Sequence, residues 1–305
     1  MSDAGVVIFR SARRAACDER AFVLAAVGIA TDLHFDGAEF VLRVPHAEAS
    51  QALTHLTQYE LELAARAERP APPAVPLHGG AWIGCVVYVG ILCYVAYAVA
   101  TGQWRLDAFD AGELDARLVQ SGQWWRSWTA LTLHVDAAHL IANTAAGVWF
   151  GYLAARLLGS GSAWLLIVVG AGCANWLEAH FAPATHRAVG ASTAVFAALG
   201  LLSAYSWRIR YRHRDRWARR WAPLIAGMLL LAWTGTGGAD LNAARPADTG
   251  VDVLAHGLGF ALGALLGVGA AGEDMTRRLN RVPQWLSGLA AIALIALAWG
   301  RALSS

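Results

Sequence analysis

The chain has 305 residues, of which 57% are hydrophobic and only 15% are charged, with a net charge of +2. Soluble domains carry about 25% charged residues, so this composition excludes an ordinary soluble globular protein. Long stretches almost free of charge predict a polytopic membrane protein embedded in a lipid bilayer. The small net charge gives no support to nucleic-acid binding, and we expect no nucleic-acid partner.

Residues 1–69 predict a small soluble α+β domain. Asp36-Gly37 lies between two short apolar runs and is a hairpin turn signal. The elements expected are strands at 6–9, 33–35 and 40–44 and helices at 13–26 and 47–65. This domain has no nucleotide-binding glycine pattern, and its ligand is unknown. Four prolines then predict a semi-rigid linker over residues 70–80.

The remaining sequence contains seven apolar segments long enough to span a bilayer. They cover residues 81–101, 138–158, 162–181, 190–207, 221–236, 251–271 and 283–302. Arginines cluster at 208–220 and 277–281, which predicts that these two loops face the cytoplasm. The N-terminus then also lies in the cytoplasm, and residues 102–137, 182–189 and 237–250 face outward. The composition favours a bacterial inner membrane.

Ser192 is a candidate nucleophile because small residues surround it in Gly190-Ala191-Ser192-Thr193-Ala194. Taken alone the signal is weak, since serines in membrane helices usually bond to a carbonyl of the preceding turn. His256 is predicted in the same leaflet, and each lies less than about 10 Å below the outer end of its segment. Gly259 and Gly263 share the His256 face and allow close approach of another helix. The alternative is a structural histidine bonded to a carbonyl.

His139 and Asn143 are four residues apart and therefore lie on one helical face. Both can donate a side-chain hydrogen bond to an oxyanion that develops during acyl transfer. The alternative is a polar pair that joins two membrane helices.

These motifs together resemble the rhomboid family of intramembrane serine proteases. The resemblance covers residues 81–271 and rests on Trp125-Arg126, His134, His139-x-x-x-Asn143, Gly190-x-Ser192 and Ala255-His256-x-x-Gly259-x-x-x-Gly263. It implies an all-α, six-helix catalytic core, followed over residues 272–305 by a basic cytoplasmic loop and a seventh transmembrane helix.

The resemblance also implies a role for each of these residues. Ser192 would be the nucleophile and His256 the general base, without a carboxylate, a metal or another cofactor. His139, Asn143 and the Ser192 N–H would stabilise the oxyanion. Phe196 would hold the His256 ring, Trp125 and Arg126 would belong to the outer loop, and His134 would line the water-filled cavity that the 237–250 loop caps.

The sequence departs from the family pattern at two positions. Thr193 stands where the family usually has glycine, and Ala130 stands where many bacterial members have a histidine. A β-branched residue narrows the backbone choices next to the serine. We expect Thr193 to affect substrate preference more than activity, because no proton-transfer residue is missing.

The resulting expectation is a serine endopeptidase that cleaves transmembrane proteins in or near their membrane segments. Three alternatives stay open. An inactive rhomboid-like protein would bind membrane clients without cutting them. A transporter or channel would place acidic residues or broken helices near mid-membrane. A metalloenzyme would use His134, Asp136 and His139, although the histidine spacing suits one helical face poorly.

Overall fold

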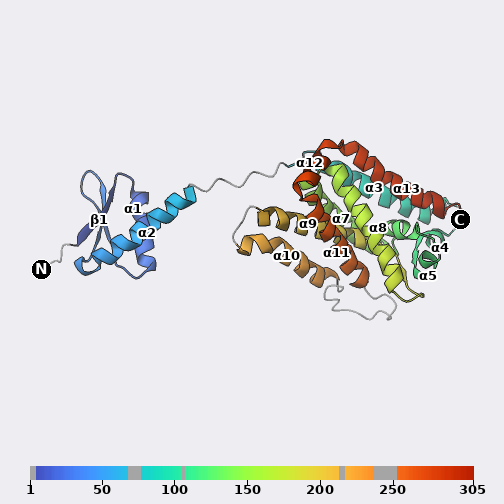
Figure 1. The fold of residues 1–305 in the computed structure, drawn as a ribbon, viewed down its shortest axis with the longest axis horizontal. Coiled ribbons are helices and arrows are strands. Elements are labelled where there is room, and N and C mark those ends of the chain that lie inside the picture. Colours follow the sequence, from blue (N-terminus) through green and yellow to red (C-terminus); the bar gives the residue numbers. More distant parts are fainter. Residues whose placement is uncertain (1–4, 68–76, 105–106, 213–216, 236–252) are drawn as a thin grey trace. The chain divides into compact units, whose positions relative to one another are not determined.

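The computed structural model describes residues 5–67, 77–104, 107–212, 217–235 and 253–305. The chain divides into two compact units, Met1–Pro73 and Ala74–Ser305 (Figure 1). Most of the predicted linker at 70–80 lies outside the described residues, as does the predicted cap at 237–250.

The first unit contains a three-stranded antiparallel sheet and two helices. Its elements are β1 (Val6–Ser11), α1 (Arg14–Ala26), β2 (Asp32–Phe35), β3 (Phe40–Val44), the 3-10 turn η1 (His46–Glu48) and α2 (Ala49–Ala67). The strand order is β1-β3-β2. The Asp36 carboxylate accepts hydrogen bonds from the backbone N–H groups of Ala38 and Glu39, which closes the predicted hairpin. Leu24, Leu42 and Leu56 belong to the buried core.

The described residues of the second unit are helical apart from one two-residue strand pair and the connecting loops. Its elements are α3 (Ala81–Ala100), α4 (Ala108–Gly112), β4 (Leu114–Asp115), α5 (Ala116–Gln120), α6 (Arg126–Thr129), η2 (Ala130–Thr132), α7 (Ala137–Leu158), α8 (Ser160–Phe181), β5 (Arg187–Ala188), α9 (Ser192–Arg212), α10 (Trp217–Gly235), α11 (Val253–Ala270), α12 (Glu273–Arg281) and α13 (Gln284–Ala302). A long helix occupies each of the seven predicted segments.

Two features of this unit were not predicted. Helix α9 continues to Arg212, because arginine is a good helix former although it is polar. Helix α12 forms in the basic loop, where Glu273 and Asp274 in its first turn and Arg281 in its last turn complement the helix dipole.

Within the described residues, four helices are long and apolar enough to cross a membrane, namely α3, α8, α11 and α13. They make the second unit an all-α membrane fold. Helices α7 and α9 are less apolar, because α7 carries His139, Asn143 and Arg156, and α9 ends in arginines. That α7, α9 and α10 also cross is part of the proposal below.

Helix α9 lies at the centre of this unit, in contact with α7, α8, α10 and α11. Its side chains are buried almost without interruption from Thr193 to Tyr205. Alanine and glycine make up much of this stretch, so neighbouring helices can approach closely from several sides.

Helix α13 packs against α8 and against the folded segment that precedes α7 (Figure 1). The Trp299 indole N–H donates to Thr132 Oγ1 at 3.0 Å. Ile295, Ala298 and Trp299 share a buried cluster with Trp125 and Leu133. The seventh helix is therefore an integral part of the unit.

Candidate active site

The segment that enters α9 is held in place by backbone hydrogen bonds. Gly190 has φ +132°, a conformation that favours glycine, and its N–H donates to the Ala130 carbonyl at 2.9 Å. The N–H of Ala191 donates to Nε2 of His134 at 3.3 Å. Position 130 thus contributes its carbonyl, which any residue supplies, to the placement of this segment.

A polar cluster fixes the residues just before this segment. Arg187 in β5 forms ion pairs with Glu113 at 2.6 Å and with Asp115 at 3.3 Å, beside the β4–β5 strand pair. His186 Nε2 lies 2.9 Å from Oε1 of the fully buried Glu178. Sequence reasoning missed this cluster. Glu178, an acidic residue at the end of an apolar segment, was the signal that could have predicted it, because a buried carboxylate requires a partner.

Ser192 and His256 lie at the same end of two closely packed helices. Ser192 is the first residue of α9, and a Cβ atom added at Gly259 of α11 would lie only 2.7 Å from the carbonyl oxygen of Thr193. The Phe196 ring, one turn after Ser192, packs against the His256 ring in a tilted arrangement, with centroids 4.3 Å apart and an interplanar angle of 37°. His256 is 7% exposed and Phe196 is 5% exposed, so the contact is buried.

His139 and Asn143 of α7 approach the same segment from another side. A Cβ atom added at Gly190 would lie 2.7 Å from Cε1 of His139 and 3.7 Å from Nδ2 of Asn143. Nδ2 of Asn143 donates to the His139 carbonyl at 3.1 Å, and an amide nitrogen has a second hydrogen to donate. The structure thus brings His139, Asn143 and Gly190 together next to Ser192.

His134 lies in the turn before α7, with its ring 5.1 Å from the His139 ring. Burial, aided by the neighbouring His139, lowers the pKa of His134 to about 4. The ring is therefore neutral at pH 7, which agrees with Nε2 acting as the acceptor for the Ala191 N–H. We conclude that His134 supports the segment before Ser192.

Trp125 and Arg126 stabilise the folded segment that precedes α7. The Arg126 side chain is 5% exposed. It donates to Oε1 of Gln123 at 2.6 Å and to the carbonyls of Asp110 at 2.7 Å and Glu113 at 3.0 Å. The Arg301 guanidinium lies 5.3 Å from the centre of the Trp125 ring. These contacts stabilise the fold of residues 107–132.

Asp136, one of the three residues of the possible metal site, has a hydrogen-bond partner in the backbone. The Asp136 carboxylate accepts from the His139 backbone N–H at 2.7 Å and caps the start of α7. Across the described ranges, no three His, Cys, Asp or Glu side chains are grouped to hold a metal ion.

Comparison with known proteins gives three matches that include rhomboid in their description. The family model of the Rhomboid domain matches residues 121–272. Rhomboid protease GluP from Bacillus subtilis is 39% identical over 103 residues, which cover 34% of this chain and 20% of that protein. Putative rhomboid protease YdcA from the same organism is 31% identical over 96 residues, or 31% of this chain and 46% of that protein. The matches thus span less than half of either relative, and no solved structure matches significantly. The matched region contains α9 and α11 and the glycine-mediated contact between them. The chain belongs to the rhomboid family.

Proposed function

We propose that this chain is a serine endopeptidase that hydrolyses peptide bonds in or near the transmembrane segments of membrane proteins. The observation that carries the proposal is the buried ring contact between Phe196 and His256, one turn from Ser192, across the α9–α11 contact. A histidine held beside a serine at a helix start is suited to nucleophilic catalysis. The two relatives named as rhomboid proteases support the same activity.

In the proposed mechanism, the Ser192 hydroxyl attacks the scissile carbonyl carbon while His256 accepts its proton. The oxyanion receives hydrogen bonds from the Ser192 N–H and from the side chains of His139 and Asn143. The Ser192 N–H is suited to this role because it precedes the first intrahelical hydrogen bond, in which Val195 N–H donates to the Ala191 carbonyl. Protonated His256 then gives its proton to the leaving amine. Water attacks the acyl-enzyme with His256 again acting as base, which releases the acid product and restores Ser192.

The proposal includes a layout in the membrane. Residues 1–69 form a cytoplasmic domain, 70–80 a linker, 81–271 a core with six crossings, and 272–305 a cytoplasmic loop and a seventh crossing. The arginines of residues 208–220 and 277–281 support this orientation, since cytoplasmic loops are rich in arginine. Ser192 and His256 then lie near the outer side of a bacterial inner membrane, where water can reach them.

Thr193 is the feature of the sequence that favours an inactive client-binding protein. The placement of its side chain in the contact between α9 and α11 supports an active enzyme instead. Thr193 is 4% exposed. Its methyl carbon Cγ2 lies 3.2 Å from where a Cβ of Gly259 would be. The side chain therefore occupies space that the missing Gly259 side chain leaves free.

The test is cleavage of single-span reporter proteins by the purified chain, comparing wild type with Ser192→Ala and His256→Ala. We expect the wild type to cut and both variants to be inactive. Ser203→Ala is the matched control, because Ser203 is a buried serine of the same helix, about three turns away. It should retain activity.

A serine-directed fluorophosphonate probe provides a second readout that does not depend on the choice of reporter. Wild type and Ser203→Ala should be labelled at Ser192. If the wild type cuts none of several reporters and Ser192 stays unlabelled, the client-binding alternative replaces the proposal.

A further inference from the structure

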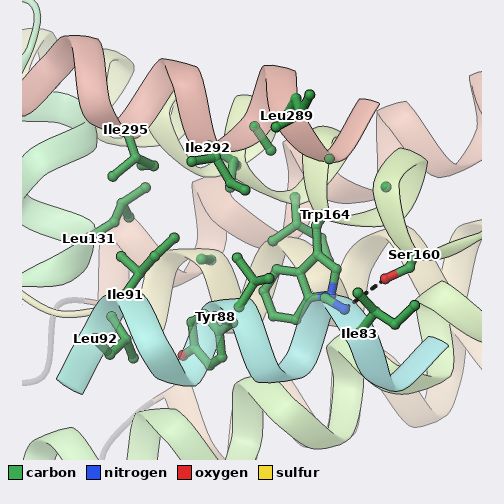
Figure 2. Close-up of a pocket in the computed structure, with 18 of the residues that line it drawn as sticks. Ile83, Tyr88, Ile91, Leu92, Leu131, Ser160, Trp164, Leu289, Ile292 and Ile295 are labelled. Atoms are coloured by element: carbon green, nitrogen blue, oxygen red, sulfur yellow. Dashed lines mark hydrogen bonds between the residues drawn. The ribbon is translucent and has the colours of Figure 1, made fainter. Parts of the chain in front are cut away.

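A cavity of about 430 Å³ lies between α3, α8 and α13 (Figure 2). This volume falls within the range of about 300–1,000 Å³ that is typical of ligand pockets. Aliphatic side chains of the three helices form most of the wall, and Leu131, Ala191 and Ala194 also contribute. Ala191 precedes α9 and Ala194 lies in its first turn, so the cavity extends to the helix that carries Ser192.

The three helices that form the main walls are among the four that are apolar enough to cross a membrane. The cavity therefore lies at the depth of the bilayer, where hydrocarbon chains are the surrounding solvent. Its lining runs along α3 from Ile83 to Leu92. At 1.5 Å per residue this is about 13 Å, close to half of a hydrocarbon core of about 30 Å. The length is that of one leaflet.

One end of the cavity is polar, although two of its side chains already bond within the protein. Ser160 Oγ accepts from the Gly84 N–H at 2.8 Å, and Gln284 Oε1 accepts from the Ser162 N–H at 3.0 Å. The starts of α8 and α13 meet there, at Ser160 and Gln284, beside Gly84 near the start of α3. The Trp164 indole is 8% exposed, and its N–H has no hydrogen-bond partner among the described residues. Its nitrogen edge faces the Ser160 end of the cavity in Figure 2. A buried indole N–H usually has an acceptor.

Polar side chains elsewhere in the lining bond within the protein. The Tyr88 hydroxyl donates to the Asn143 carbonyl at 2.9 Å, and the Thr132 hydroxyl donates to the Thr129 carbonyl at 2.8 Å. The cavity thus offers one unsatisfied donor at one end and a long apolar interior. That polarity matches a molecule with an acceptor at one end of a hydrocarbon chain.

We propose that this cavity binds one acyl chain of a membrane phospholipid, with the ester carbonyl at the Trp164 N–H. The chain would extend along α3 and α13 toward Leu131 and Ala191. The starts of three helices lie at the ester end, and their positive dipole ends favour the nearby phosphate. The bound lipid would complete the packing between α13 and the core. This inference does not depend on the proposed protease activity.

The test uses a phosphatidylglycerol with a photoactivatable diazirine at the end of one acyl chain, added to the full chain in nanodiscs. After illumination, adducts are mapped by peptide mass spectrometry. We expect the adducts at residues of the inner end, such as Ile91, Leu131 and Ala194. Val87→Trp, which fills the cavity, should reduce these adducts at least tenfold.

Val86→Trp is the matched control, because Val86 is the neighbouring residue, is 60% exposed and is absent from the cavity lining. It should leave the inner adducts unchanged. If Val87→Trp fails to fold, Ile292→Trp on α13 fills the same cavity, with Leu297→Trp at a 64% exposed position as its control.

Two outcomes would overturn the proposal. Adducts that occur only on outward-facing residues, or that are equal in the filled and control variants, would mean that no chain enters the cavity. Labelling by a free fatty acid with the same diazirine, but not by the phospholipid, would assign the site to a free acid.

Discussion

Two helix pairs in the membrane unit use glycine in different ways. Along α11, Gly259, Gly263 and Gly267 face the backbone carbonyls of Thr193, Ala197 and Leu201, so contact with α9 repeats every four residues. Between α8 and α13, Gly161 meets the Gln284 backbone at the start of both helices. Farther along, Ala291, Ile292 and Ile295 of α13 border the cavity.

The difference shows that close helix packing can be concentrated in one part of a membrane fold. Lipid tails are as apolar as leucine, so helices associate in a membrane through close packing and hydrogen bonds. The α9–α11 pair has a continuous backbone contact and holds the two residues whose relative position the proposed chemistry requires. The α8–α13 pair has its glycine-mediated backbone contact at one end, and a membrane lipid in the proposed cavity would add contacts farther along.

The largest expected effect is that of Gly263→Ala on stability. A Cβ atom at position 263 would overlap the Ala197 carbonyl group, so the two helices must separate along their length. Overpacking of this kind costs about 1–3 kcal/mol, and we expect a value near the upper limit. The free energy of unfolding in mixed detergent micelles measures it.

Gly269→Ala is the control for this variant, because nothing lies within 4 Å of a Cβ atom added at Gly269 of the same helix. It should be neutral or slightly stabilising. Equal stability of Gly263→Ala and Gly269→Ala would show that the two helices are not in backbone contact.

Gly259→Ala should affect the proposed activity more than stability. The added Cβ would lie 2.7 Å from the Thr193 carbonyl oxygen, so the first turn of α9 must shift relative to His256. Because small misplacements of reacting groups slow catalysis strongly, we expect about a tenfold loss of kcat/KM. Gly257→Ala, which meets open space, is the control. Retention of full activity by Gly259→Ala would argue against a rigid serine–histidine geometry.

The repeating contact was predictable from the sequence, whereas the cavity was not. Gly259 and Gly263 lie on the His256 face because of the helical period alone, and the small residues after Ser192 identify the partner helix. The polar cluster before Ser192 joins Glu113 to Arg187, 74 residues away, and no local pattern encodes such a pair. The cavity depends on where three distant helices diverge. The expected cap at 237–250 lies outside the described residues.

Tyr88→Phe tests the side chain that joins the cavity wall to helix α7. The Tyr88 ring stacks on Trp164 beside the cavity with centroids 4.8 Å apart, and its hydroxyl donates to the Asn143 carbonyl. Phenylalanine keeps the stacking and loses one hydrogen bond, so we expect a loss of about 1 kcal/mol in unfolding free energy. The control is Tyr97→Phe, at a 63% exposed position of the same helix. A loss no greater than that of the control would mean that this bond does not stabilise α7.

Gly288→Ala on α13 is the smallest expected change and the sharpest contrast with Gly263→Ala. Both substitutions place alanine in a helix interior, where it is favoured over glycine by about 0.5–1 kcal/mol. At Gly288 the nearest atom to an added Cβ is the Gly161 Cα at 3.8 Å, an ordinary van der Waals contact. The preference of alanine over glycine in a helix should therefore decide the effect. We expect the free energy of unfolding to rise by about 0.5 kcal/mol in the same assay. Gly161→Ala, which would meet the Gln284 carbonyl, is the opposite control on the facing helix. If Gly288→Ala destabilised the protein as much as Gly263→Ala, α13 would lie closer to α8 than the structure shows, and the cavity would be too narrow for an acyl chain.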